Sequence, residues 1–358
     1  MCMSDNLGPR YGGLSFGRRG AAYILGGENM GFQFVPGAIQ SPPDPRDYIY
    51  SQMVAAPELP ASFFWPRLPV RDQGKWGTCV GQAAAGVKDR QESVNYPSRG
   101  YRFSPLFIYA LCKQQDGIPN QEGTYPRVAM AVLKNTGACK EQTLPYSLMA
   151  NPLPPVPEAA VTEAKQFQIG VYARIQTLEE IKTAIMRDGP VLAAVFVCDN
   201  FIECEPGGFI DLPEGRWRGG HAILLDGWDD NLAHTYKNGV TRKGFLRLAN
   251  SWGPGWGDNG YGWLPYDFLT YRSDIGMPYF MEAWSSVDVI IPPKPASEVV
   301  LWIDSTRALV DGEEVILDQP PVIDAGSKRT LVPLRFLAEV LGWKVMWNEG
   351  ERKITLTR

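Results

Sequence analysis

The chain has 358 residues, enough for two domains and a full-sized core. Its 35 basic and 39 acidic residues leave a formal net charge of -4, so charge gives no reason to expect a nucleic acid or an anionic membrane as partner. No apolar run approaches the roughly 20 residues that cross a bilayer. The apolar stretch behind Arg18 and Arg19 is too short for the core of a secretory signal, so no signal peptide is identified.

Glycine and turn-forming residues dominate the start of the chain, and we interpret residues 1–58 as an N-terminal extension. Residues 59–290 then mix helical and strand patterns. Helices are expected from Cys79 onward, over 104–112 with Ser104 as N-cap, over 126–134 and over 178–187. Strands are expected over 191–197, 222–228, 244–250 and 260–265. Helices first and strands later favour an α+β fold with two packed halves.

A proline-rich segment, residues 291–297, is typical of a linker. Residues 298–358 form a second, smaller unit. Its expected strands are 299–303, 308–310, 314–317 and 353–357, and its expected helix is 332–341.

The most informative segment surrounds Cys79, which follows a glycine-bearing loop and begins a predicted helix. The partial positive charge at a helix N-terminus favours a thiolate over a thiol. Gln73, six residues earlier, offers a side-chain amide that can donate to a developing oxyanion. Cys79 is therefore a candidate nucleophile.

A thiolate nucleophile needs a base, and the chain has two histidines. His221 stands at the entrance of an apolar strand behind two glycines, whereas His234 lies in a polar loop. We therefore take His221 as the base. Asn250, at the end of a later strand, can orient the imidazole, and Trp252 can shield that hydrogen bond from water.

Together these segments resemble the papain family of cysteine peptidases, in which cysteine, histidine and asparagine follow in this order. The resemblance spans residues 59–290. It implies a papain-like two-lobed fold, with a helical left half and a β-barrel-like right half. It also implies Gln73 as oxyanion donor, Cys79 as nucleophile, His221 as general acid and base, and Asn250 as orienting residue.

The same resemblance suggests where substrate binds. The segment before Pro126 is similar to the strip that pairs with a substrate backbone, which makes Gly123 a candidate, and Trp252 is a second one. Trp76 and Val80 depart from the family pattern near the nucleophile, as does Thr124 in the strip. The extension 1–58 is either a propeptide that fills the cleft, as in a zymogen, or an arm on the surface.

The C-terminal unit, 298–358, resembles the small stalk-type domain named after the N-terminal domain of copper amine oxidases. That domain recurs in bacterial exported and cell-surface proteins, which favours a place outside the cytoplasm. Neither histidine and no cysteine lies in it, so we expect no copper site, and no metal or cofactor elsewhere. We expect a structural role, or docking to a cell surface or another protein.

Six cysteines give no zinc-type spacing. Cys112 with Cys139, and Cys198 with Cys204, are possible disulfides, and buried free thiols explain them equally well.

A cell-wall amidase or acyltransferase is the alternative to a peptidase that acts on peptides or proteins. A non-catalytic protein that kept the peptidase shell is a third reading, disfavoured because all four site residues are present.

Overall fold

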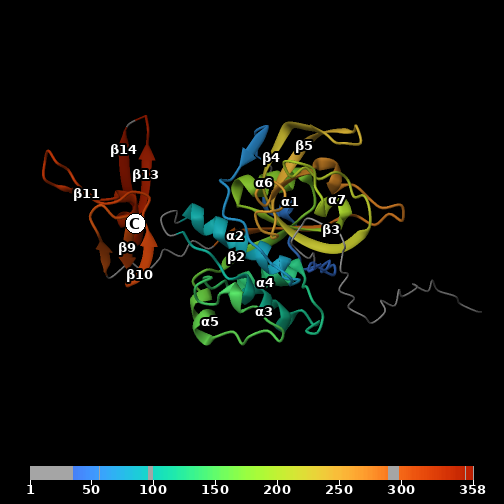
Figure 1. Cartoon of the computed structure of the whole chain (residues 1–358), viewed down its shortest axis with the longest axis horizontal. Coiled ribbons are helices and arrows are strands. Elements are labelled where there is room, and N and C mark those ends of the chain that lie inside the picture. Colours follow the sequence, from blue (N-terminus) through green and yellow to red (C-terminus); the bar gives the residue numbers. More distant parts are fainter. Residues whose placement is uncertain (1–34, 56, 96–99, 289–297, 351, 358) are drawn as a thin grey trace, which may run out of the picture.

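The computed structural model describes residues 35–55, 57–95, 100–288, 298–350 and 352–357 (Figure 1). Up to residue 288 these form a mixed unit in which helices α2 to α5 gather on one side of a seven-stranded sheet. The expected α+β class is confirmed by this mixture. The linker predicted over residues 291–297 lies outside the described residues.

Helix α2, Cys79–Asn95, is the long central helix of the mixed unit. Its first intrahelical bond runs from Gln82 N to Thr78 O. Glycine lets α2 approach its neighbour closely, because a Cβ on Gly81 would lie 2.8 Å from the carbonyl oxygen of Pro105. Small residues in the first two turns therefore set how deeply the start of α2 is buried.

The next two helices begin as the sequence predicts. Helix α3, Pro105–Gln115, has Ser104 as N-cap, whose side chain accepts from Phe107 N at 3.0 Å. Helix α4, Pro126–Asn135, also starts on a proline, which has no N–H to leave unsatisfied in the first turn. Both helices pack against α2 in the same apolar core.

The sheet is open, with strand order β2-β7-β3-β4-β5-β6 and β1 paired to β4. Its strands are β1 (Ser62–Phe64), β2 (Ile169–Ile175), β3 (Val191–Cys198), β4 (Trp217–Thr235), β5 (Thr241–Ala249), β6 (Tyr261–Pro265) and β7 (Phe280–Asp288). Within the described residues β2 and β6 end the sheet without pairing to each other, so the expected barrel-like half does not close. The predicted strands appear, while β1, β2 and β7 were missed.

Two apolar cores lie on opposite faces of the sheet. One joins α2, α3 and α4 to residues such as Trp284, and the other collects residues such as Trp228 and Trp256. The remaining helices of the unit are α1 (Tyr50–Met53), α5 (Glu158–Ala164), α6 (Leu178–Arg187) and α7 (Asp199–Ile202). Helix α6 carries a capping box between Thr177 and Glu180 and matches its predicted bounds.

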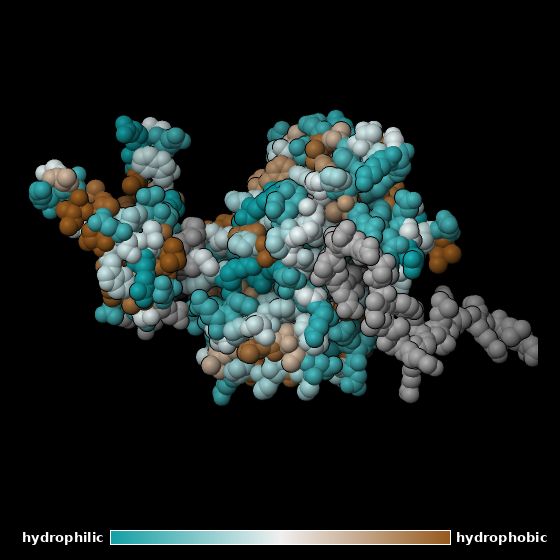
Figure 2. Space-filling view, viewed as in Figure 1, coloured by the Kyte–Doolittle hydropathy of each residue, from teal (hydrophilic) through white to brown (hydrophobic). Residues whose placement is uncertain are grey.

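The C-terminal unit holds three small sheets and one helix. These are β8 (Val299–Leu301), β9 (Arg307–Val310) and β10 (Glu313–Ile316), then β11 (Val322–Ile323) with β12 (Thr330–Leu331), helix α8 (Leu334–Val340), and β13 (Lys344–Asn348) with β14 (Lys353–Thr357). Figure 2 shows apolar residues gathered at the β11–β12 hairpin, where Ile323 and Leu331 are exposed. Strands β11 to β13 were not predicted.

Among the described residues, Cys79, Cys112, Cys139, Cys198 and Cys204 are free thiols, so neither possible disulfide forms in this structure. No helix in the described part of the chain is long and apolar enough to cross a bilayer.

Candidate active site

Cys79 is the first residue of α2 and is fully buried. Its thiol lies beside the backbone N–H of Ala222, the residue that follows His221 on β4. Burial raises the pKa of this thiol to about 12, against the smaller lowering effect of neighbouring N–H groups. The thiol is therefore neutral in the structure as it stands.

His221 and Asn250 are held together by the sheet. His221 lies opposite Val195 of β3, and Asn250 directly follows β5. The imidazole Nε2 and the Asn250 Oδ1 are 2.7 Å apart, so Nε2 carries the hydrogen and donates to the amide oxygen. Burial lowers the pKa of His221 to about 4, with the Asn250 bond as an opposing effect. The imidazole is neutral here as well.

Aromatic rings cover the imidazole–amide bond. The centroid of Trp252 is 4.5 Å from that of His221, and Phe201 stands edge-on to both rings. Trp252 is almost completely buried. These rings shield the bond between His221 and Asn250 from water.

Gln73 is positioned from two sides. Its backbone N–H donates to Ser251 O at 2.8 Å, and its side-chain Oε1 accepts from Ser251 Oγ at 2.8 Å. Its Nε2 donates to Trp76 O at 2.8 Å and to the carbonyl of Val35 at 3.3 Å. Because Ser251 follows Asn250, one short loop holds both the orienting residue and the amide donor.

The N-terminal arm, which we define as residues 35–49, runs directly across these groups. Gly37 N donates to Gly220 O at 3.0 Å, beside the base. A Cβ on Gly37 would lie 2.9 Å from Cys79 Sγ and would also collide with Gly77 O. The arm thus passes directly against the Cys79 thiol.

The arm also pairs with the strip before α4, and it does so through Thr124. Thr124 N donates to Gly37 O at 2.9 Å, and Ile39 N donates to Thr124 O at 3.0 Å, in parallel orientation. Gly123 instead receives the arm closely, since a Cβ there would lie 2.6 Å from Gly37 O. Its own N–H and carbonyl bond to Tyr109 and Lys113. Sequence reasoning singled out Gly123 and passed over Thr124.

Further along, the arm is tied to the mixed unit by polar contacts. Ser41 N donates to the buried carboxylate of Glu282 at 2.7 Å. Arg127, in α4, pairs with Asp44 at 3.1 Å and with Asp47 at 3.5 Å. These contacts fix the register in which Gly37 meets Cys79.

No group of three or more metal-ligating side chains occurs among the residues that the structure describes. The chemistry available at this site is that of a thiol, an imidazole and two side-chain amides.

Curated relatives match the mixed unit. An uncharacterized peptidase C1-like protein of Acanthamoeba polyphaga mimivirus is 27% identical over 55% of this chain and 64% of its own length. A gut-specific cysteine proteinase of Caenorhabditis elegans is 25% identical over 69% of this chain and 79% of its own. The chain thus spans slightly less than two thirds of the viral relative.

A solved structure shares the fold. Xylellain, a cysteine protease from Xylella fastidiosa, superposes with a TM-score of 0.58 at 26% identity, covering 71% of this chain and 96% of that chain. A procathepsin B from Trypanosoma congolense, at 20% identity and a TM-score of 0.52, agrees in fold.

Two family models match the chain. The model "Copper amine oxidase N-terminal domain" matches residues 284–356, which contain no histidine or cysteine. The imidazole and thiolate ligands that copper prefers are therefore missing from this stretch, and its single methionine, Met346, does not make a copper site. The model "Papain family cysteine protease" matches residues 60–269, more than half of the chain. The chain therefore belongs to the papain family of cysteine proteases and is a cysteine-type peptidase.

Proposed function

We propose that this protein cleaves peptide bonds with Cys79 as nucleophile, His221 as general acid and base, and Asn250 as the residue that orients the imidazole. The observation that carries this assignment is the 2.7 Å bond between His221 Nε2 and Asn250 Oδ1, with the next residue after His221, Ala222, placing its backbone N–H beside the thiol of Cys79. It leaves the imidazole Nδ1 as the atom that exchanges a proton with the thiol.

In the first half of the reaction, His221 takes the thiol proton and the Cys79 sulfur attacks the carbonyl carbon. The new S–C bond forms while the carbonyl oxygen gains negative charge, which Gln73 Nε2 and the Cys79 N–H stabilise. His221 then gives its proton to the leaving amine as the C–N bond breaks. In the second half, water, deprotonated by His221, hydrolyses the thioester and restores the thiol.

We propose further that the chain is made as a zymogen. Three observations support this: the backbone of Gly37 lies against Cys79, the amide of Gln73 donates to Val35 O, and the arm pairs with Thr124 in the parallel sense. The neutral states that burial imposes on Cys79 and His221 work in the same direction, because attack requires a thiolate. Displacement or cleavage of the arm would restore solvent to the pair.

The test combines labelling with turnover. The full chain, before and after limited proteolysis of the arm, is treated with an epoxide thiol inhibitor and analysed by intact mass, and a fluorogenic peptide assay follows activity. We expect slow labelling at Cys79 before cleavage and rapid labelling afterwards. Full activity in Cys79→Ala, with Cys198→Ala as matched buried-thiol control, would exclude the assignment. Turnover of peptidoglycan fragments but not of peptides would favour a cell-wall amidase.

The C-terminal unit is, in our proposal, a docking module for the cell surface. Its hairpins expose Ile323, Leu331 and Trp347, more apolar surface than a small unit normally leaves in water. Cosedimentation of the full chain with bacterial cell walls tests this, with a double Ile323→Lys, Leu331→Lys variant expected to stay in solution. Equal sedimentation of the two proteins would remove the support from these hairpins.

A further inference from the structure

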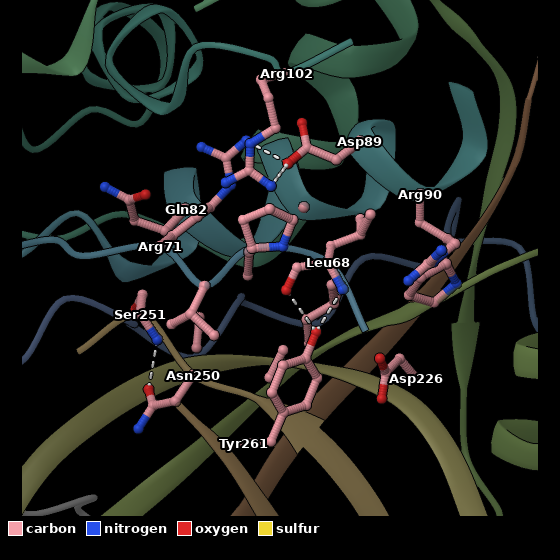
Figure 3. Close-up of a pocket in the computed structure, with 18 residues that line it drawn as sticks. Leu68, Arg71, Gln82, Asp89, Arg90, Arg102, Asp226, Asn250, Ser251 and Tyr261 are labelled. Carbon is pink, nitrogen blue, oxygen red and sulfur yellow. Dashed lines mark hydrogen bonds and ion pairs between the residues drawn. The ribbon is translucent and has the colours of Figure 1, made fainter. Parts of the chain in front are cut away.

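A small cavity lies behind the catalytic residues, between the inner face of α2, the segment 68–71 and strands β4 to β6. Its volume is about 40 Å³, and a cavity needs roughly 10–15 Å³ by this kind of measure to hold one water. Pro69 of the covering segment is exposed, so small solutes have a short path inward. Figure 3 shows Arg71, Arg102 and Asp89 meeting on one side and Arg90 and Asp226 lying on the other.

The two carboxylates on this lining, Asp89 and Asp226, are bound to other arginines. Asp89 Oδ1 accepts from Phe103 N at 2.8 Å, and its Oδ2 accepts from Arg71 at 2.6 Å and lies 2.8 Å from Arg102. Asp226 accepts from Arg247 through both oxygens, at 2.8 and 3.0 Å. Both carboxylates are thus bound to arginines other than Arg90, and neither forms an ion pair with it among the described residues.

Arg90 is the cation left over. It is only 4% exposed, and its terminal nitrogens donate to Pro66 O and to Ser93 Oγ, which are uncharged. Among the described residues it has no carboxylate at ion-pair distance, and its Nε has no partner. Burial lowers the pKa of this guanidinium, with Asp226 as the largest opposing charge. The guanidinium also lies 5.8 Å from the centroid of the Trp65 ring, a weak cation–π contact, so its surroundings supply no full negative charge at ion-pair distance.

On the other side of the cavity, the positive and negative charges are closer to balance. Arg71 and Arg102 share Asp89, and the half-buried Glu141 also acts on Arg102 through space. Even so, Arg71 Nε is buried and has no partner in the described chain. The lining as a whole offers N–H donors and one unit of uncompensated positive charge.

We propose that this cavity is a binding site for one small monovalent anion of the halide class, held near Arg90 and Arg71. An isolated buried cation is costly, and an anion beside it removes most of that cost. By this measure the cavity holds roughly three waters, a volume that favours a small anion over phosphate or a larger organic anion. The site is independent of the zymogen proposal, because its lining includes no residue of the arm.

The position of the site links it to catalysis. Asn250 and Ser251 line the same cavity, and Ser251 Oγ donates to Gln73 Oε1. Gln82 and Ala83 of the nucleophile's helix form another part of the wall. An anion here would steady the packing between α2 and the loop that carries the orienting amide.

The experiment measures the melting temperature of the full chain while chloride replaces gluconate at constant ionic strength. We expect a saturable rise of several degrees with chloride. Arg90→Met should abolish this response and Arg90→Lys should retain part of it. Arg335→Gln, which removes an exposed arginine of the C-terminal unit, should retain all of it. Equal melting temperatures in the two salts, or a full response in Arg90→Met, would overturn the proposal.

A second measurement does not depend on the variants folding. Crystals of the wild-type full chain grown in bromide should show an anomalous scattering peak inside the cavity, within hydrogen-bonding reach of Arg90. Ordered water without anomalous signal at that position, with bromide elsewhere on the surface, would overturn the assignment.

Discussion

The backbone N–H of Thr124 donates to the carbonyl of Gly37 across 2.9 Å, and Ile39 returns a bond to the carbonyl of Thr124. The two segments run parallel. This pairing holds the arm in extended form and brings the one arm residue without a side chain against Cys79 Sγ. A chain held in this way resembles a bound peptide in its hydrogen bonds, yet it is tied by further contacts, including the bond from Ser41 N to Glu282 of β7.

Gly37→Ala should activate the full chain without cleavage. The new methyl group would collide with Gly77 O and approach Cys79 Sγ to 2.9 Å, and neither neighbour can move far. Gly37 has no positive φ, so the effect is steric and confined to the arm's fit. We expect epoxide labelling of Cys79 to accelerate by about tenfold or more, as a loss of about 1.4 kcal/mol in arm binding would give.

Gly326→Ala is the matched control for that experiment, since its nearest neighbour would be an ordinary contact at 3.6 Å. Its labelling rate should equal that of the wild type. If Gly37→Ala labels as slowly as this control while remaining folded, the arm does not guard the thiol.

Gln73→Glu should lower kcat with little change in KM. The new carboxylate can still accept from Ser251 Oγ, as Oε1 does now at 2.8 Å, but the donor that points toward Val35 O is lost. Loss of one oxyanion donor costs on the order of 10²–10³ in kcat. Steady-state kinetics on the arm-cleaved protein measure this, and exposed Gln166→Glu is the control. An unchanged kcat would remove Gln73 from the machinery.

Two variants, Asn250→Asp and Asn250→Ala, should separate the effect of orienting the His221 ring from the effect of a charge beside it. The aspartate would place a negative charge at the 2.7 Å position, which favours imidazolium, so the acidic limb of the kcat/KM profile, where the base becomes protonated, should move to higher pH. The alanine frees the ring and should cost at least ~10-fold in kcat, part of the ~10²–10⁴ that a positioned base provides. Identical pH profiles for wild type and Asn250→Asp would contradict this role.

Much of the candidate site could be predicted because its residues lie in short sequence segments with recognisable patterns. A cysteine that starts a helix, an amide six residues earlier and a histidine behind two glycines are local patterns. The cap of α3 was equally predictable, since Ser104 accepts from a backbone N–H three residues later, whereas the capping box of α6 was not predicted. The structure adds the contacts between these segments.

The parts of the fold and of the arm that were not predicted depend on long-range pairing that no local pattern encodes. Strand β7 lies between β2 and β3 although it comes last in the unit, and the register of the arm is fixed by Thr124, Gly220 and Glu282 from three separate elements. The short strands β11 and β12 are two residues each, too short to show an alternating pattern. Because the contacts that hold the arm come from segments far apart in the sequence, sequence reasoning left the propeptide and the surface arm as equal alternatives.

Acid should destabilise the arm-covered chain through His221. Burial holds the pKa of this imidazole at about 4, below its ordinary value of 6.5. A depressed histidine pKa means that the unfolded chain binds the proton more tightly, so this contribution to stability is present above pH 6.5 and is lost as pH falls toward 4. The loss should reach about 3 kcal/mol at pH 4. Urea unfolding at pH 7 and pH 4 measures it, with His221→Gln expected to lose less stability over that interval than the wild type. The same loss in His221→Gln as in the wild type would show that other groups carry the acid dependence.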